Sequence, residues 1–386
     1  MKCLTSMFAL CATATMALAQ ALPSQTDVRG IMRKVADWQV EHQPQVRHDP
    51  KDWTNGALYR GMFDWATLAE ATESDKSYLY WLEGIADGCR WGTTKRKSFP
   101  YHADDFTVCQ TWLGLYGRFG GKHRMEPTQK RIDEVIAKPA KSSLTFVNQE
   151  WKQAGLLDRW SWCDALYMAP QVYANIWVIT KDRKYLDFMN QEYKATTDYL
   201  YDKDEHLFFR DSRYFPQGTE KTKGQVEKNG KKIFWGRGNG WVIGGLANLL
   251  RILPKDCPDR AYYEQLFKEM AGALAKLQCA DGYWHASLLD PESYPSPETS
   301  ATGFIVYGLL YGINEGLLDR EATLPVALKG WKALCDAVEK DGKLGYVQPI
   351  GADPRKVTRE MTEVYGVGAF LQAGMQMHRL ATPAAK

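Results

Sequence analysis

The sequence has no strong excess of charge of either sign and no long hydrophobic run in its main part. Its 49 basic and 46 acidic side chains leave a formal net charge of +3, so no basic surface predicts a nucleic-acid partner. No segment beyond the first twenty residues is apolar over the roughly 18 positions that a membrane-spanning helix needs, and no span is expected. With 45% hydrophobic and 25% charged residues, the chain has the balance of a globular protein.

Cysteine is sparse and without pattern. Two of the eight cysteines lie within the first twenty residues, and the other six are scattered, with no C-x-x-C pair and no zinc-finger spacing with histidine. Neither a cysteine metal site nor a disulfide framework is therefore predicted. Buried free thiols are the simplest interpretation, although one disulfide is compatible with an oxidising compartment. The six are Cys89, Cys109, Cys163, Cys257, Cys279 and Cys335.

The chain begins with MKCLTSMFALCATATMALA, which has the form of a secretory signal peptide. Lys2 supplies the positive start, an apolar stretch follows, and Ala17–Ala19 forms an A-x-A cleavage site. We expect cleavage after Ala19, export across the inner membrane and a periplasmic location. A lipid anchor at Cys11 is the weaker alternative. Residues 20–386 are then expected to form a single catalytic domain.

Apolar residues recur at helical spacing through most of the remaining chain, which predicts a mostly helical protein. Strand signals are limited to two short segments, 206–210 and 282–287. Twelve helices are predicted near 27–43, 55–72, 75–92, 104–119, 126–139, 164–180, 182–200, 238–253, 259–278, 300–314, 324–339 and 361–378.

Every other predicted helix is rich in glycine, alanine and other small residues, as in 240–247, 303–312 and 364–369. Small side chains let a helix pack closely on all sides, whereas the intervening helices, such as 260–276, are amphipathic and charged. Six alternations of an inner with an outer helix predict an all-α fold, an (α/α)6 barrel of six helical hairpins around an axis. A less symmetric helical bundle is the alternative.

Residues with useful chemistry gather where the predicted inner helices begin. Parallel inner helices would bring their N-termini, which favour anions, to one end of the axis. Aromatic rings stack on sugars, carboxyl groups act as acids or bases, and arginine binds carboxylates. The combination therefore predicts a site for an acidic sugar. The six starts are 53–59, 102–105, 160–164, 234–241, 298–300 and 359–363.

Asp164 and Asp105 are the candidate catalytic acids. Each lies in an apolar or aromatic stretch that can raise the pKa of a carboxyl group. Helix capping is the alternative role for both, and Asp104 is better explained as a cap.

Three basic residues are candidates for binding the substrate. Arg237 lies in a glycine-rich segment where a ligand can come close to the backbone, and a tight turn with a structural salt bridge is its alternative role. Arg210 faces the pocket or pairs with Asp211. His285 bonds a sugar or is a structural histidine.

Five segments resemble the unsaturated rhamnogalacturonyl hydrolases of glycoside hydrolase family 105, which are related to the unsaturated glucuronyl hydrolases. The resemblance covers essentially the whole chain after the signal peptide. The W-x-D-x-L-Y-M and W-x-R-G-N-G-W pieces in this order are specific. The segments are HADDFTVCQTWLGLY (102–116), RWSWCDALYMAP (159–170), HLFFRDSRYF (206–215), FWGRGNGWV (234–242) and DGYWHASLLDPESYPSPETSATGFIVYGL (281–309).

The resemblance implies hydrolysis of an oligosaccharide with a 4,5-unsaturated uronic acid at its non-reducing end, most simply a pectin (rhamnogalacturonan) fragment made by a lyase. The reaction begins with hydration of the C4=C5 bond. By resemblance, Asp164 protonates C4 and then assists water at C5, and Asp105 is the second aspartate.

The resemblance also implies that four residues contact the substrate. Arg237 and Trp241 correspond to substrate-binding residues, and Trp162 and Tyr59 are ring contacts. Some members of the family have a histidine where this chain has Arg210, which leaves the finer specificity open.

No metal or organic cofactor is expected, because the family reaction needs none and no P-loop, G-x-S-x-G or H-E-x-x-H motif occurs. Two other interpretations remain open. One is another (α/α)6 enzyme, either an inverting glycosidase or a polysaccharide lyase, and the other is a non-catalytic glycan-binding protein.

Overall fold

The computed structural model describes residues 21–94, 101–146 and 159–382. The predicted signal peptide lies outside the described residues. Among the helices that the structure describes, none is both long and apolar enough to cross a membrane.

Two sets of helices alternate along the described chain. The outer set is α1 (Gln25–His42), α3 (Ser77–Gly88), α5 (Glu126–Ile136), α8 (Arg183–Leu200), α10 (Arg260–Lys276) and α12 (Arg320–Asp336). The inner set is α2 (Trp53–Glu73), α4 (Cys109–Phe119), α7 (Pro170–Thr180) with the one-turn α6 (Ala165–Met168) before it, α9 (Gly236–Ile252), α11 (Thr299–Asn314) and α13 (Val364–Leu380).

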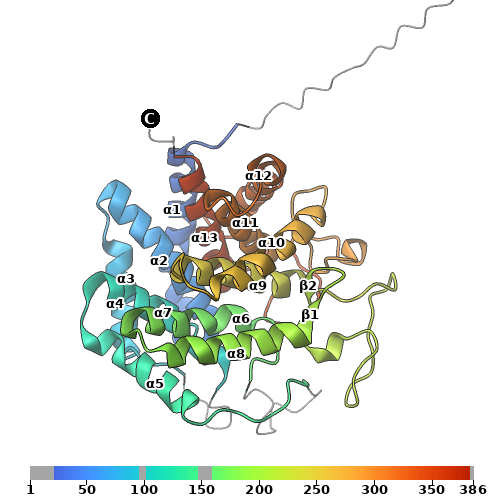
Figure 1. Cartoon of the computed structure of the whole chain (residues 1–386). Helices are drawn as coiled ribbons and strands as arrows, with labels where there is room; N and C mark the ends of the chain where they lie inside the picture. Colours follow the sequence, from blue (N-terminus) through green and yellow to red (C-terminus); the bar gives the residue numbers. More distant parts are fainter. Residues whose placement is uncertain (1–20, 95–100, 147–158, 383–386) are drawn as a thin grey trace, which may run out of the picture.

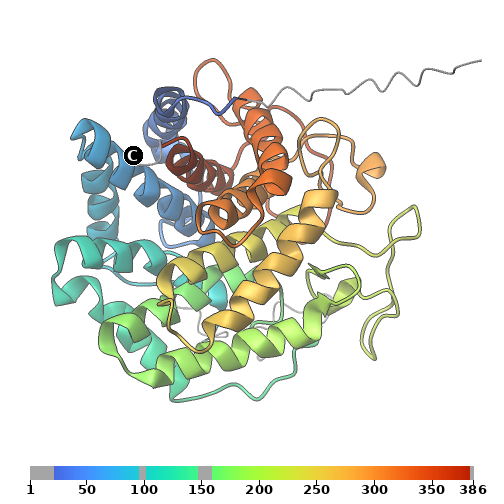
Figure 2. The same cartoon turned by 45° about the horizontal axis from the view of Figure 1, so that its top comes forward.

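The inner helices form a closed ring. Each contacts the next, from α2 through α4, α7, α9 and α11 to α13, and α13 returns to α2. In Figure 2 the colours run around this ring from blue to red, and α1 lies beside α13 in Figures 1 and 2. The predicted (α/α)6 barrel is confirmed.

Glycine allows the ring to close where α2 meets α13. A Cβ atom on Gly61 would lie 2.2 Å from the carbonyl oxygen of Gly368, and one on Gly368 would lie 2.2 Å from the carbonyl oxygen of Ala57. Both contacts are to backbone atoms, which cannot rotate away. The small residues of the inner helices therefore decide how closely these two helices approach.

Two predicted inner helices are interrupted near their starts. The predicted helix 164–180 is divided between α6 and α7, because Pro170 has no N–H group to continue the hydrogen bonding of α6. The predicted helix 104–119 begins with a separate 3-10 turn, η2 (Ala103–Phe106), before α4. Both interruptions lie at the end of the barrel where the candidate acids are found.

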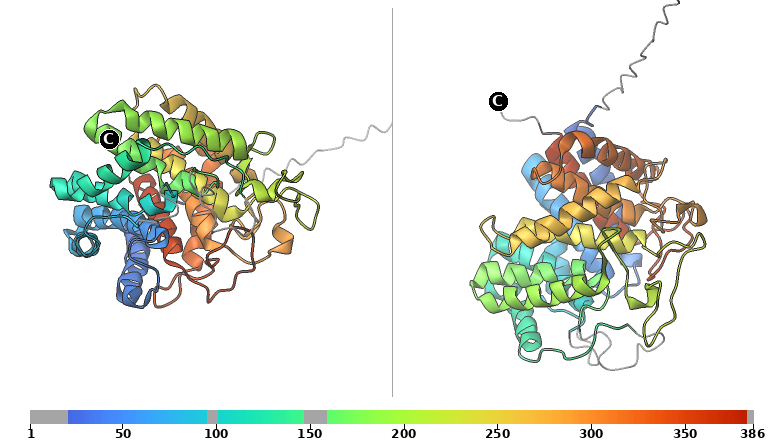
Figure 3. Two further views of the ribbon diagram at one scale, coloured as in Figure 1. Left: turned by 90° about the horizontal axis from the view of Figure 1, so that it is seen from below. Right: turned by 45° about the vertical axis from the view of Figure 1, so that its right-hand side comes forward.

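Extended structure occurs in both predicted segments and also outside them, in Tyr201–Asp202 and in the isolated bridges of Thr219 with Thr222 and of Val338 with Leu344. Strand β2 (Leu207–Phe208) pairs antiparallel with β1 (Tyr201–Asp202), and Ser287 forms an isolated bridge with Trp235. The bridge fastens the segment before α11 to the start of α9. Figure 3 shows the long connection from α8 to α9 projecting beyond the helices.

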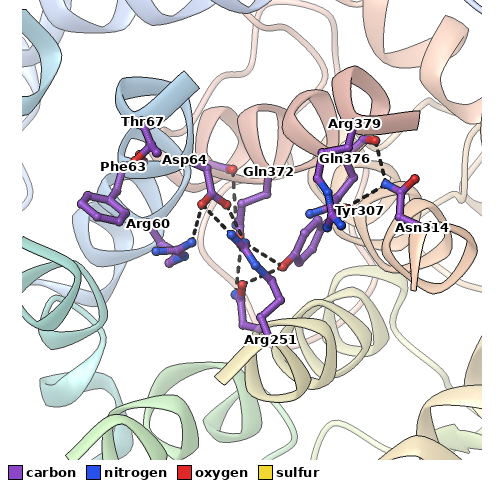
Figure 4. Close-up of polar contacts among 12 residues, drawn as sticks. Arg60, Phe63, Asp64, Thr67, Arg251, Tyr307, Asn314, Gln372, Gln376 and Arg379 are labelled. Atoms are coloured by element: carbon purple, nitrogen blue, oxygen red, sulfur yellow. Dashed lines mark hydrogen bonds and ion pairs between the residues drawn. The ribbon is translucent and has the colours of Figure 1, made fainter. Parts of the chain in front are cut away.

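A polar network joins the inner helices beyond the candidate acids, toward their C-terminal ends. Asp64 of α2 accepts hydrogen bonds from Arg251 of α9 at 2.8 and 3.0 Å and pairs with Arg60. Arg251 also donates to the hydroxyl of Tyr307 on α11. Figure 4 shows these side chains converging together with Gln372 of α13. The ion pairs allow charged groups to be buried inside the ring.

Candidate active site

A cavity of about 590 Å³ lies at the N-terminal ends of the inner helices. Its walls come from the starts of α2, α4 and α6, from the α8–α9 connection and from the α12–α13 connection. The lining residues are Trp53, His102, Asp104, Phe146, Trp162, Asp164, Met168, Arg210, Arg213, Tyr214, Gln225, Ile350, Gly351, Ala352, Asp353 and Arg355.

Asp164 lies in this cavity and is 8% exposed. It precedes α6, but its side chain accepts no hydrogen bond from the helix N-terminus, so it does not serve as a cap. Its Oδ2 lies 3.3 Å from Nε of Arg210 and 3.5 Å from Sγ of Cys163. The N–H of Cys163 donates to the carbonyl of Arg210 at 2.8 Å. Arg210 therefore holds the turn before α6 with its backbone and approaches the carboxyl group with its side chain.

Arg210 stands between two carboxyl groups. Asp211, which is fully buried, accepts from Arg210 at 2.7 Å and from Arg213 at 2.8 Å. Burial by itself would raise the pKa of Asp211, but the two arginines lower it below its usual value. Burial would lower the pKa of Arg210, yet Asp164 and Asp211 raise it. The sequence left open whether Arg210 faces the pocket or pairs with Asp211, and it does both.

The turn η2 directs its two aspartates differently. Asp104 lines the cavity, with one carboxylate oxygen 3.6 Å from Nδ1 of His102. Asp105 is 1% exposed and does not line the cavity. It lies near Cys109, where burial first and then this carboxyl group raise the pKa of the thiol to about 12. The geometry thus places Asp104, and not the predicted Asp105, beside the space for a ligand.

Trp162 and His102 form one side of the cavity. Their rings lie 5.0 Å apart, and Nδ1 of His102 accepts the N–H of Asp104 at 3.3 Å. Trp162 is thus brought to the cavity as the sequence predicts.

The other two predicted aromatic contacts lie in the core. Tyr59 is stacked against Trp112 at 5.9 Å, and Trp241 packs 4.3 Å from Phe304, each with almost no exposed surface. Neither lines the cavity.

Arg237 does not line the cavity either, but it holds a wall in place. Its guanidinium group donates to the carbonyl oxygens of Gln348 at 2.5 Å and Pro349 at 3.0 Å. It lies between the rings of Trp235 and Tyr365, at 4.5 and 4.9 Å. The residues that follow Pro349 line the cavity, so Arg237 acts on the site through this connection.

His285 also lies outside the cavity lining. Its Nε2 is 2.9 Å from Oδ2 of Asp281, and its Nδ1 is 3.4 Å from the carbonyl oxygen of Pro291. Burial lowers the pKa of this histidine, but Cys279 and Asp281 together raise it to about 9.

Several lining residues were not singled out from the sequence. Tyr214 and Gln225 follow the predicted arginine segment, and Phe146 contacts the guanidinium group of Arg213 at 4.2 Å. Asp353 and Arg355 form an ion pair of 2.8 Å in the α12–α13 connection. A charged Asp-Pro-Arg segment between two predicted helices was the only sequence signal for the last pair.

The model of Glycosyl Hydrolase Family 88 matches residues 31–381. The chain belongs to glycoside hydrolase family 88. The sequence resembled family 105, and the family whose model matches is family 88. The predicted relation to the unsaturated glucuronyl hydrolases is confirmed, and the protein is a glycosidase.

Relatives of this family 88 enzyme carry related names. An unsaturated 3S-rhamnoglycuronyl hydrolase from Formosa agariphila is 40% identical, with 92% of each chain covered. A protein of the same name from an Alteromonas species is 35% identical, with 92% of this chain and 86% of that protein covered. A solved structure of a polysaccharide lyase is 31% identical with a TM-score of 0.80, covering 94% of this chain and 99% of that one.

The charges of the family 88 site suit an acidic sugar. Three aspartates and three arginines line the cavity. Arg210 and Arg213 share the buried Asp211, and Arg355 pairs with Asp353. Arg210 and Arg213 outnumber the one buried carboxylate that they share, so they can also pair with a substrate carboxylate.

Proposed function

We propose that this enzyme removes a 4,5-unsaturated uronic acid from the non-reducing end of an oligosaccharide in which rhamnose is the next sugar. The observation that carries the proposal is Asp164 in a cavity beside Trp162 and Arg210. The names of the two relatives support rhamnose as the neighbouring sugar. Rhamnogalacturonan fragments from a lyase are a substrate of this class.

Asp164 is proposed to act first as an acid and then as a base. Its carboxyl group gives a proton to C4 while water adds to C5, and the carboxylate recovers a proton from that water. The hemiketal at C5 opens to a ketone, and the hemiacetal left at C1 releases the next sugar. One water molecule is consumed overall. Arg210 and Arg213 would bind the uronate carboxylate.

Asp104 is proposed as the second carboxyl group of the reaction, because it lines the cavity and Asp105 does not. Its place beside His102 suits it to hold a substrate hydroxyl or the attacking water. The family resemblance favours Asp105 instead, so the activities of variants at the two aspartates can be compared directly.

The decisive experiment follows the ultraviolet absorbance of the conjugated double bond. An unsaturated uronyl-rhamnose disaccharide should lose this absorbance and release one rhamnose for each bond lost. The same disaccharide with a sulfate on rhamnose O3 tests whether Arg355, the remaining arginine of the cavity lining, accepts a second anion. Unchanged absorbance with a panel of unsaturated disaccharides would contradict the proposal.

A lyase activity is the second candidate, favoured by the similarity to the solved polysaccharide lyase. A lyase needs a base near the uronate, and His102 and Tyr214 both line the cavity. Burial first, and then Asp211, raise the pKa of Tyr214, so less of the phenolate that could act as the base is present at neutral pH. A lyase would increase the ultraviolet absorbance of a saturated glycuronan, whereas the proposed hydrolase would leave it unchanged.

Export is part of the proposal. The N-terminal sequence supports secretion across the inner membrane, which would bring the enzyme to lyase products in the periplasm. Expression of the whole chain in a Gram-negative host, followed by N-terminal sequencing of the periplasmic protein, tests cleavage after Ala19. Recovery of the uncleaved chain from the cytoplasm would contradict it.

A further inference from the structure

Three side chains that bind metals in other proteins meet in the turn after α10. One ligand atom each from Cys279, Asp281 and His285 lies within 4.8 Å of the other two. The closest pair is Nε2 of His285 and Oδ2 of Asp281, at 2.9 Å. None of the three lines the cavity described above, so the cluster is separate from the proposed reaction.

The backbone holds this turn in one shape. The N–H of Cys279 donates to the carbonyl of Tyr283 at 2.9 Å, and the N–H of Gly282 donates to the carbonyl of Cys279 at 3.0 Å. Gly282 has a φ of +91°, which favours glycine. Oδ1 of Asp281 accepts the N–H of Tyr283. These bonds leave Oδ2 and Sγ directed toward the histidine without further folding.

The other nitrogen of His285 has the partner that a metal-binding histidine normally has. Nδ1 lies 3.4 Å from the carbonyl oxygen of Pro291 and can only donate to it. Histidines that bind metals usually donate their second ring nitrogen to a carbonyl or carboxylate, which orients the ring. Nε2 then faces a carboxylate oxygen and a sulfur atom. A proton on Nε2 joins it to the carboxylate alone, whereas a metal cation in that place joins all three ligand atoms.

We propose that Cys279, Asp281 and His285 bind one Zn²⁺ ion, with water as the fourth ligand. Zinc accepts sulfur, nitrogen and oxygen together, whereas a thiolate is unsuited to Mg²⁺ or Ca²⁺. Bonds of about 2.0 to 2.3 Å in a tetrahedron place the ligand atoms about 3.2 to 3.6 Å apart. Small rotations about the side-chain bonds bring the three atoms to those separations. The Cys-x-Asp-x3-His spacing matches no zinc-finger pattern, which is why the sequence did not indicate this site.

The ion would stabilise the fold. Ala286, next to the histidine, accepts the N–H of Gly236 at 2.7 Å, and the N–H of Leu288 donates to Phe234 at 2.9 Å. Zinc would therefore tie the end of α10 to the segment that supports the start of α9. We expect it to raise thermal stability and not to take part in the chemistry at Asp164.

Cobalt provides a direct test, because Co²⁺ bound to a thiolate has a charge-transfer band in the near ultraviolet. The purified protein, freed of metal by a chelator, is titrated with Co²⁺ and then with Zn²⁺, and bound metal is measured by elemental analysis. The variants are Cys279→Ser and Asp281→Asn. The matched control is Cys335→Ala, because Cys335 is another partly exposed free thiol.

The wild type and Cys335→Ala should bind about one ion and show the band, and Zn²⁺ should remove it. Cys279→Ser should lack the band, and Asp281→Asn should bind at least about tenfold more weakly. Zn²⁺ should raise Tm in the wild type and not in Cys279→Ser. A wild type without the band, or equal binding in all variants, would overturn the proposal. Neither readout depends on glycosidase activity.

Discussion

At the scale of single residues, the site depends on Arg210, whose guanidinium group contacts two carboxyl groups. It contacts Asp164 with Nε and Asp211 with Nη1. Arg213 donates to the same Asp211, so the carboxylate that satisfies both arginines lies behind the cavity and not in it. The pairs of Arg210 and Arg213 with Asp211 therefore do not depend on Asp164.

Replacing Asp164 by asparagine keeps the shape of the side chain and removes the exchangeable proton. We expect kcat to fall by about 10² to 10⁴ with the fold intact, because general acid–base catalysis contributes about that much. The rate is measured by the loss of double-bond absorbance, and the fold by circular dichroism. Asp187→Asn, on the exposed face of α8, is the control and should retain full activity. An active Asp164→Asn would remove the residue from the proposed role.

The neighbouring aspartates give a matched pair of variants. Asp104→Asn should reduce kcat/KM strongly, because Asp104 lines the cavity. Asp105→Asn should leave kcat near the wild-type value and change mainly the stability, because Asp105 is buried away from it. Steady-state kinetics and urea unfolding of both variants make the comparison. The reverse result would restore Asp105 as the second carboxyl group.

At the scale of elements, inner helices are joined by backbone contact as well as by side chains. Helices α2 and α13 approach so closely that glycine is needed at Gly61 and Gly368. Gly84 of the outer helix α3 has no such constraint, since a Cβ atom there would meet nothing within 4 Å. The same substitution at Gly368 and at Gly84 should therefore have opposite effects on stability.

Gly368→Ala should lower the free energy of unfolding by about 1 to 3 kcal/mol, the usual result of overpacking. Gly84→Ala should raise it by about 0.5 to 1 kcal/mol, because alanine favours an exposed helix more than glycine does. Urea unfolding followed by circular dichroism measures both. A neutral Gly368→Ala would show that α2 and α13 can separate without loss.

At the scale of the whole molecule, buried ion pairs inside the ring couple stability to pH. Burial raises the pKa of Asp64, but Arg251 and Arg60 outweigh it and lower the pKa below 3.8. The net pKa of Asp211 is lowered in the same way by Arg213 and Arg210. The native state therefore holds fewer protons on these groups than the unfolded chain does.

Stability from these two carboxylates is complete above the unfolded pKa of 3.8 and is lost as pH falls through the lower native values. We expect the urea midpoint to decrease steadily from about pH 5 downward. Asp64→Asn should be less stable at neutral pH and should show a flatter decrease. An unchanged pH profile in this variant would mean that Asp64 contributes nothing to acid unfolding.

The residues of the site were predictable to different degrees. Asp164 and Trp162 stand in a specific motif at an inner-helix start, Arg210 lies in the segment 206–215 that resembles the family, and the structure places all three in the cavity. The sequence analysis chose Asp105 and took Asp104 as a cap, whereas the structure places Asp104 in the cavity. Successive residues of a 3-10 turn point about 120° apart, and the sequence does not show which of them faces inward. The sequence analysis did not single out Cys279, Asp281 and His285 together, because their spacing follows no known zinc motif.

The order of inner and outer helices follows from the sequence alone, because burial on every side demands small residues and burial on one side demands an amphipathic pattern. Those are local properties that a chain carries before it folds. Tertiary structure alone decided that Arg237 holds the carbonyls of Gln348 and Pro349, more than a hundred residues away. It also decided which carboxyl groups face the cavity, because contacts between distant segments, and not local spacing, orient these side chains.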